Sequence, residues 1–330
     1  INTDTLEQRP YHFETDSNGF IVPSRPNETP DIQIAFLGGS TTEALYVDPN
    51  VRFPFLVSRK LEDALGITVN GINSGVSGNH SMHSNFILMS KILPLQPDFA
   101  VMMHAGNDLG TMLQLGNYWN ENLHRSIIIR ETQDPKRLVS AIQSLKSFIY
   151  ASLPNTMRTL KTVSIKIKEA IIDRPDDKNL LRPEEDEFAA VRGKKIKLAT
   201  ERFLSDFKKS LRTFVEICRV WDVTPVLMTQ ANRLTEAPDE LSLRAMKRIK
   251  KQGLSYDVMR DVNLRFQQSI RDVASEEEVL LIDLHQLVPQ ANTYMYDGMH
   301  YNNKGSTLVA DIITQALLPS IKVRLAVKQG

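Results

Sequence analysis

Cysteine is almost absent from this chain of 330 residues, in which Cys218 stands alone. A single cysteine excludes an internal disulfide and a zinc site built from several thiolates. Because Cys218 ends a helical pattern, Thr213–Cys218, we predict that it is a small buried hydrophobic residue. No apolar run reaches the roughly 20 residues needed to span a bilayer. The 40 basic and 39 acidic residues nearly balance, so we expect no nucleic-acid partner.

Two further absences concern cofactors and the start of the chain. The glycine turn Gly38-Gly39-Ser40 is not part of a GxxxxGK[ST] or GxGxxG pattern, so we expect no nucleotide there. The first residue is Ile1 rather than methionine, which leads us to expect that a signal peptide, an anchor helix or a tag has been removed. We predict that the protein works without a cofactor.

Short apolar runs alternate with helical patterns along most of the chain. The runs that we predict to be strands are Ile32–Leu37, Thr68–Val76, Phe99–Met103, Val223–Met228 and Val279–Leu284. Strands that alternate with helices indicate a parallel sheet covered on both faces. We therefore predict an α/β fold, a three-layer α/β/α sandwich with a five-stranded parallel sheet, over residues 31–330. Helices are expected from Pro54 and from Ser306 to Leu318.

Two segments depart from this alternation. Residues 1–30 are polar, contain four prolines and show no helical period, so we expect an extended N-terminal arm that packs on the domain. Residues from about 111 to 200 are predicted to form a helical insertion over the cleft. Within it, residues 136–168 carry seven lysines or arginines and no acid. This pattern favours a solvated face, with contact to a membrane surface as the alternative.

Residues suited to acyl transfer lie at both ends of the chain. Ser40 directly follows two glycines at the end of the first predicted strand, where its hydroxyl can project from the sheet edge. Serine needs a base, and the spacing of Asp297 and His300 lets the carboxylate bind one ring nitrogen while the other accepts a proton. Alternatives stay open: Ser40 can serve as a turn or cap residue, and Asp297 with His300 as a structural pair.

Two residues suit the stabilisation of a developing oxyanion. Gly78 offers a backbone N–H in the loop after the second strand, and Asn107 offers a side-chain amide after the third. Each is also a common turn residue. The carboxyl ends of parallel strands share one edge of the sheet, so we expect both groups to lie near Ser40.

Histidines near these motifs are compatible with either a metal or acid–base chemistry. Gly78-Asn79-His80 is similar to a metallophosphoesterase turn, but that pattern requires an acid where Ser81 stands. It also requires an Asp-x-His near the N-terminus, which is missing. We therefore predict no catalytic metal. We expect His80, His83 and His104 to line the cleft, with His80 and His104 as substrate-binding residues.

Four blocks, within about residues 32–110 and 220–320, resemble those of the SGNH/GDSL hydrolases. They are Gly38-Gly39-Ser40-Thr41-Thr42-Glu43, Asn73-Ser74-Gly75-Val76-Ser77-Gly78, Gly106-Asn107-Asp108 and Asp297-Gly298-Met299-His300. The resemblance implies a flavodoxin-like sheet. It also implies that Ser40 is the nucleophile, that His300 is the base and that Asp297 orients the base. The amides of Ser40 and Gly78 and the Asn107 side chain would form the oxyanion hole. Gly39 departs from the family, which usually has aspartate there.

The resemblance also implies an activity. We expect a serine esterase that hydrolyses a short-chain acyl ester, such as an O-acetyl group on a carbohydrate, through an acyl-enzyme. The alternatives are an acyltransferase to a polysaccharide, a lysophospholipase or lipid esterase, and a non-catalytic binding module. Asn18-Gly19-Phe20 resembles exported or membrane-anchored bacterial members, so an extracytoplasmic location is expected. The sequence makes no prediction of the oligomeric state.

Overall fold

A sheet of five parallel strands forms the centre of the computed structural model, which describes residues 6–7, 9–119 and 194–329. These residues belong to one compact unit, Ile1–Ile127 with Ala190–Gly330. The strands are β1 (Ile32–Gly38), β2 (Val69–Asn73), β3 (Phe99–Met103), β4 (Thr224–Met228) and β5 (Leu280–Ile282). Their order is β2-β1-β3-β4-β5, that of a flavodoxin-like sheet. The predicted fold class is confirmed, and each of the five predicted strands is present. Two predicted bounds were wrong: β2 ends at Asn73 rather than Val76, and β5 ends at Ile282 because Leu284 already belongs to a helix.

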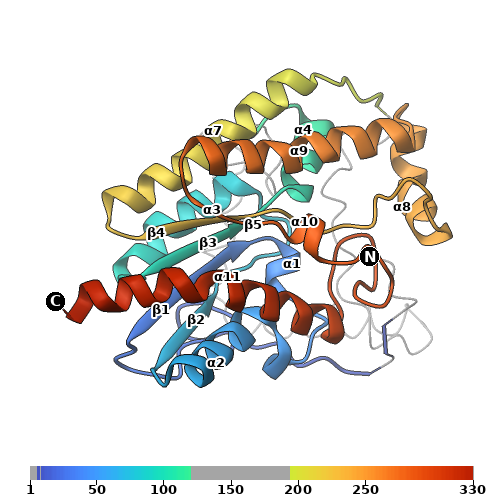
Figure 1. Cartoon of the computed structure of the whole chain (residues 1–330). Coiled ribbons are helices and arrows are strands. Elements are labelled where there is room, and N and C mark those ends of the chain that lie inside the picture. The colour runs from blue at the N-terminus through green and yellow to red at the C-terminus, as the bar shows by residue number, and fades with distance from the viewer. Residues whose placement is uncertain (1–5, 8, 120–193, 330) are drawn as a thin grey trace, which may run out of the picture. The chain divides into compact units, whose positions relative to one another are not determined.

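Helices cover both faces of this sheet. Their bounds are α1 (Ser40–Glu43), α2 (Phe53–Leu65), α3 (Ser81–Ile87), α4 (Gly106–Leu115), α7 (Thr200–Val220), α8 (Glu240–Lys251), α9 (Tyr256–Glu276), α10 (Leu284–Leu287) and α11 (Asn303–Gln329). Helices α2 and α11 lie together on one face, and α7 and α9 lie on the other (Figure 1). The three predicted layers are therefore present.

The side chains of β1 show why the sheet needs a cover on each face. Ile34 and Phe36 belong to the apolar cluster on the α2 and α11 side, whereas Ala35 and Leu37 belong to the cluster on the α7 and α9 side. Successive residues of a strand point to opposite faces, so a strand that is apolar at every position must be buried on both. These four side chains are fully buried.

The last helix is longer than predicted. Helix α11 continues beyond Leu318, includes Pro319 and ends at Gln329, so the predicted end was wrong. The apolar stripe explains the extension, because Ile313, Leu317 and Ile321 recur every fourth residue and are all buried against the sheet. Burial of this stripe offsets the backbone hydrogen bond that a proline inside a helix removes.

Cys218 lies in α7 and is fully buried, as predicted. Burial disfavours the charged thiolate and raises the pKa of this thiol to about 12. A thiol in this environment packs as a small apolar side chain and has little nucleophilic character at neutral pH.

The described part of the N-terminal arm contains no helix and is bound to the domain. Phe20 and Ile21 are buried, and the Ile21 N–H donates to the Asn73 carbonyl at 3.0 Å. The buried guanidinium of Arg52 donates to the Val22 carbonyl at 2.7 Å and to the His12 carbonyl at 2.6 Å. Arg52 therefore attaches the arm to the start of α2.

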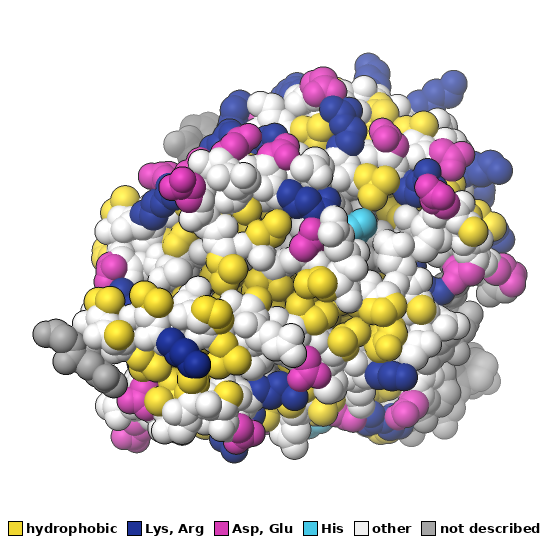
Figure 2. Space-filling view, viewed as in Figure 1, with side chains coloured by type: hydrophobic (Ala, Val, Ile, Leu, Met, Phe, Trp, Pro, Cys, Tyr) yellow, Lys and Arg dark blue, Asp and Glu magenta, His cyan; other side chains and the backbone are white. Residues whose placement is uncertain are grey.

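Most of the predicted insertion, including the basic stretch 136–168, lies outside the described residues. None of the helices in the described parts has the length and hydrophobicity that a bilayer crossing requires. On the face shown in Figure 2, basic and acidic side chains are interspersed, and hydrophobic side chains gather along α11.

Candidate active site

Ser40 begins a short helix one residue after the end of strand β1. The strand ends at Gly38, and Gly39 caps α1, of which Ser40 is the first residue. A Cβ atom at Gly38 would lie closer than 3.0 Å to the Thr42 side chain, so the turn can be this tight only with glycine there. Ser40 is partly exposed at the carboxyl edge of the sheet, where parallel α/β sheets bind ligands.

The loop before α11 brings a histidine and an aspartate to this hydroxyl. The Nε2 atom of His300 lies 2.6 Å from the Ser40 Oγ, although 260 positions separate the residues in the sequence. The Nδ1 atom of the same ring lies 2.7 Å from the Asp297 Oδ2. The structure thus brings together the three residues that the sequence predicted to act as nucleophile, base and orienting acid.

Asp297 is held by more than the imidazole. Its Oδ1 accepts the backbone N–H groups of Met299 at 2.9 Å and His300 at 2.8 Å. Burial by itself raises the pKa of this carboxyl, but the hydrogen bond and charge interaction with His300 and the two N–H groups outweigh burial, and the pKa lies below its ordinary value. Asp297 is therefore ionised at neutral pH and fixes the ring orientation.

The ring of His300 also has an aromatic neighbour that the sequence analysis did not identify. Tyr296 stacks on it with 5.5 Å between ring centroids and 10° between ring planes. Tyr46 and Tyr296 form a T-shaped pair with 5.7 Å between ring centroids. Tyr296 is buried. This stacking restricts rotation of the imidazole about its own axis. A tyrosine four residues before the histidine carries no recognisable signal in a sequence.

Asn107, the second residue of α4, lies against the turn that carries Ser40. Its side-chain Nδ2 donates to the Asn79 carbonyl at 2.8 Å. A primary amide nitrogen has two hydrogens, so this bond leaves a second N–H to donate. A Cβ atom at Gly39 would fall closer than 3.0 Å to this Nδ2 and 3.1 Å from the Asn79 oxygen. Glycine at position 39 therefore leaves room for the Asn107 amide.

Gly78 lies in the loop after β2, next to the same turn. Its φ of +84° is left-handed, a conformation that favours glycine. The loop is held against β1 because the Val76 N–H donates to the Gly38 carbonyl at 3.2 Å. At Gly75 a Cβ would fall closer than 3.0 Å to the backbone of Thr42 and Glu43, so only glycine permits this approach. The three predicted oxyanion residues thus come from two helix starts and a loop that contact one another.

A buried carboxylate joins the segments that carry these donors. The Oδ1 of Asp108, next to Asn107, accepts the Ser81 N–H at 3.0 Å, the Ser81 hydroxyl at 2.5 Å and the Tyr118 hydroxyl at 2.6 Å. Ser81 follows the Gly78 loop by three positions. Asp108 therefore fixes the start of α4 relative to that loop.

His104 lies in this buried cluster. Its Nε2 is 2.7 Å from the Ser84 hydroxyl, and its Nδ1 is 3.7 Å from the Asp108 Oδ2. Burial lowers the pKa of His104 to about 4, more than Asp108 raises it, so the ring is neutral at neutral pH. Ser84, His104 and Asp108 have the residue types of a triad, but all three are buried.

His80 is also buried, and its ring stacks on His83 with 3.8 Å between centroids. The contacts described for His80 and His104 are thus with other protein side chains. Their binding of substrate stays a prediction. In the described parts of the chain, no group of three or more His, Cys, Asp or Glu side chains is arranged to hold a metal ion.

Gln230 is a further site residue that the sequence analysis missed. It follows β4, and its side chain contacts Thr41, Gly106 and Met299, the neighbours of Ser40, Asn107 and His300. In addition, the Arg233 N–H donates to the Gly298 carbonyl at 2.8 Å, so the loop after β4 supports the loop of His300. The only signal in the sequence was the position of this loop at the end of a predicted strand.

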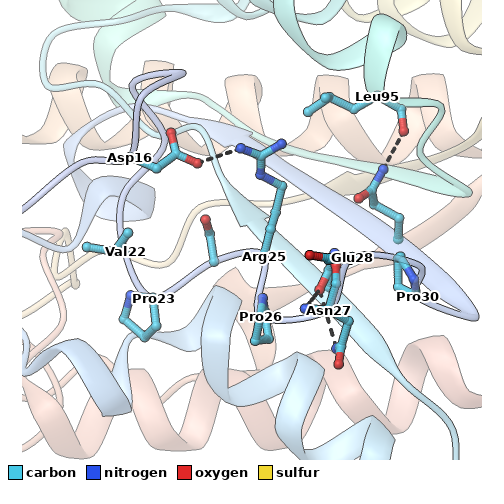
Figure 3. A pocket seen from close by; sticks show the side chains of 12 residues that line it. Asp16, Val22, Pro23, Arg25, Pro26, Asn27, Glu28, Pro30 and Leu95 are labelled. Carbon is cyan, nitrogen blue, oxygen red and sulfur yellow. Dashed lines mark hydrogen bonds and ion pairs between the residues drawn. The ribbon is translucent and has the colours of Figure 1, made fainter.

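A pocket of about 720 Å³ lies away from Ser40, under the N-terminal arm. It is lined by Gln33 and Asn70, the second residues of β1 and β2, and therefore lies toward the amino ends of the strands. Figure 3 shows Arg25 reaching toward Asp16, with 2.8 Å between Nη2 and Oδ2. Arg25 is thus already paired with Asp16, which neutralises its positive charge. The charge of Arg25 is therefore not available to bind an anionic ligand in this pocket.

Comparison with known proteins found no matching family model and no matching curated protein. Among solved structures, the chain is similar to a lipase/acylhydrolase from Enterococcus faecalis, with 15% identity, a TM-score of 0.48 and coverage of 88% of this chain and 96% of that one. It is similar to an acetylxylan esterase from Geobacillus stearothermophilus, with 12% identity, a TM-score of 0.49 and coverage of 87% and 94%. A GDSL-like lipase from Bacteroides thetaiotaomicron has 10% identity, a TM-score of 0.44 and coverage of 88% and 89%. These similarities leave the chemistry to be inferred from the side chains.

Proposed function

We propose that this protein is a serine esterase that cleaves a short-chain acyl ester through an acyl-enzyme. One observation carries the proposal: the Ser40 Oγ lies 2.6 Å from a ring nitrogen of His300, whose other ring nitrogen lies 2.7 Å from Asp297. Nucleophile, base and orienting acid in this arrangement are the requirements for attack by a serine hydroxyl.

In the first half of the reaction, the Ser40 Oγ bonds to the carbonyl carbon of the ester while its proton passes to the His300 Nε2. Asp297 stabilises the imidazolium that results, because its carboxylate is ionised and already bonded to Nδ1. The carbonyl oxygen becomes an oxyanion, for which the backbone N–H groups of Ser40 and Gly78 and the second N–H of Asn107 are the proposed donors.

Collapse of this intermediate breaks the bond between carbon and the alcohol oxygen. His300 gives its proton to the leaving alcohol, and the acyl group stays on Ser40. Water then attacks the acyl-enzyme by the same route, with His300 as base, and releases the carboxylic acid. Every proton in the cycle passes through one imidazole, so the reaction needs no cofactor.

The sequence resemblance favours a substrate in which a short acyl group is esterified to a carbohydrate hydroxyl. A series of p-nitrophenyl esters from acetyl to decanoyl tests the acyl part, with acetyl expected to give the highest kcat/KM. Preference for decanoyl would point to a lipid ester instead. Addition of acceptor oligosaccharides tests the alcohol part, since transfer that replaces hydrolysis would identify an acyltransferase.

The nucleophile is tested with a fluorophosphonate probe and peptide mapping. We expect one labelled serine, Ser40, and no labelling in Ser40→Ala. Ser205→Ala is the matched control, because Ser205 is an exposed serine on α7 and its loss should leave labelling unchanged. Asn107→Ala should reduce kcat by roughly a hundred- to thousandfold with the fold intact. Near-normal ester hydrolysis by Ser40→Ala would rule out the proposed mechanism, and an unlabelled wild type would favour a binding module.

A further inference from the structure

The side-chain amide of Gln230 bonds in two directions within the site. Its Oε1 accepts the Gly106 N–H at 2.8 Å, and its Nε2 donates to the Thr41 hydroxyl at 2.9 Å. The Thr41 hydroxyl in turn donates to the Met299 carbonyl at 3.5 Å, and the Gln230 Nε2 also lies 3.9 Å from the Met299 sulfur. One amide therefore connects three segments that are far apart in the sequence.

Each of these three contacts lies one residue from a group that the proposed mechanism uses. Thr41 follows the nucleophile Ser40, Gly106 precedes the amide donor Asn107, and Met299 precedes the base His300. The fit is tight, because a Cβ atom at Gly106 would lie 3.2 Å from Met299 and 3.3 Å from the Gln230 Oε1.

Gln230 is itself held from behind. Its backbone N–H donates at 2.9 Å to the Oε1 of Gln267, which is buried in α9. Its carbonyl accepts from the Asn232 side chain at 3.3 Å. Since Gln230 is only 8% exposed, water has little access to these bonds. A buried side chain with this many partners has essentially one conformation available.

We propose that Gln230 is a positioning residue that sets the nucleophile, the amide donor and the base at reacting distance from one another. This inference rests on the proposed function. Gln230 does not touch the reacting atoms; it acts through Thr41, Gly106 and Met299. The triad distances depend on where α1, α4 and the loop before α11 lie, and Gln230 is bonded to all three. Reaction rates are sensitive to misplacement on the scale of about 1 Å.

The test compares Gln230→Leu with Thr41→Val and Thr41→Ser, at a temperature where every variant is folded by circular dichroism. We expect Gln230→Leu and Thr41→Val to lower kcat for p-nitrophenyl acetate about 10- to 100-fold, with KM changed less than about threefold. The rate of fluorophosphonate labelling at Ser40 should fall in parallel. Thr41→Ser keeps the hydroxyl and should stay near the wild-type rate.

Gln252→Leu is the matched control, because Gln252 is another buried glutamine whose side chain bonds Gln114 rather than the site. It should lower the melting temperature without lowering kcat at the assay temperature. If Gln230 and Thr41 act through one chain of bonds, the double variant Gln230→Leu/Thr41→Val should be no slower than the slower single variant.

Two failures are distinguishable. A wild type that is not labelled at Ser40 would overturn the proposed function and this inference with it. A wild type that is labelled at Ser40, together with wild-type kcat and labelling in folded Gln230→Leu, would overturn the positioning role alone. If Gln230→Leu does not fold, Thr41→Val tests the positioning role instead, because this substitution removes a single hydroxyl. Wild-type kcat in Thr41→Val would also overturn the role.

Discussion

Replacement of Gly39 by alanine is the sharpest perturbation of the site that the structure offers. The backbone of Gly39 has φ −92°, which an alanine adopts without strain. Its added methyl group, however, would fall closer than 3.0 Å to the Asn107 Nδ2. A side-chain amide can rotate away more easily than backbone can move. We therefore expect Gly39→Ala to fold and to displace the Asn107 amide.

The size of the effect follows from the contact distances. Ordinary contact of a Cβ atom begins at 3.4 Å, and the added atom lies closer than 3.0 Å to Nδ2, so the amide must retreat by more than 0.4 Å. Catalytic groups tolerate displacement of about 0.5 Å, and a 1 Å misplacement costs about a hundredfold in rate. We expect kcat to fall roughly 10- to 100-fold. Displacement of the donor should cost no more than its removal, for which a hundred- to thousandfold loss is expected.

Steady-state hydrolysis of p-nitrophenyl acetate measures this loss, and urea unfolding checks the fold. Gly110→Ala, on α4, is the matched control, because an added Cβ there meets nothing within 4 Å and alanine favours a helix. In an Asn107→Ala background, Gly39→Ala should have little further effect, since the displaced amide is already gone. An equally large loss in that background would refute the reasoning.

Three further predictions follow from the contacts described above. Asp297→Asn should lower kcat by roughly 10⁴-fold with little change in fold, because the amide no longer stabilises the His300 imidazolium, as stopped-flow ester hydrolysis would show. His104 has a pKa of about 4 when folded and an ordinary value near 6.5 when unfolded. The unfolded chain therefore takes up this proton before the folded chain as pH falls from 7 to 4, and the free energy of unfolding should decrease by up to about 3 kcal/mol. Urea titrations should show that His104→Gln lacks this pH dependence. Arg52→Leu should release the arm and speed proteolysis within residues 9–25, and unchanged cleavage would contradict the anchoring role.

The placement of the candidate site residues at one edge of the sheet was predictable because these residues closely follow strand ends. Ser40 and Asn107 each come within four residues of the end of a buried strand, and the ends of parallel strands share one edge of the sheet. The loop of His300 was recognisable from the local spacing of Asp297 and His300. These signals are contained within a few neighbouring residues, which is why a sequence reveals them.

Other features depended on contacts between distant segments. The predicted helix end at Leu318 was wrong because the burial of Leu317 and Ile321 against the sheet stabilises α11 beyond Pro319, a residue that disfavours a helix interior. Gln230 belongs to no local sequence pattern. Its partners Gly106 and Thr41 are 124 and 189 positions away in the sequence, so only the folded structure shows that they lie within hydrogen-bond distance of its side chain.

The sequence by itself determined the strands, their helical cover and the kinds of side chain at the sheet edge, because hydrophobic periodicity and turn residues act over short range. Only the tertiary structure decided which polar residues are buried and which are accessible at the carboxyl edge of the sheet. Ser84, His104 and Asp108 have the same chemical types as Ser40, His300 and Asp297, yet the first set lies in the interior with a neutral imidazole. The physical reason is that burial and partners, rather than residue type, set whether a group can reach a substrate and hold a charge.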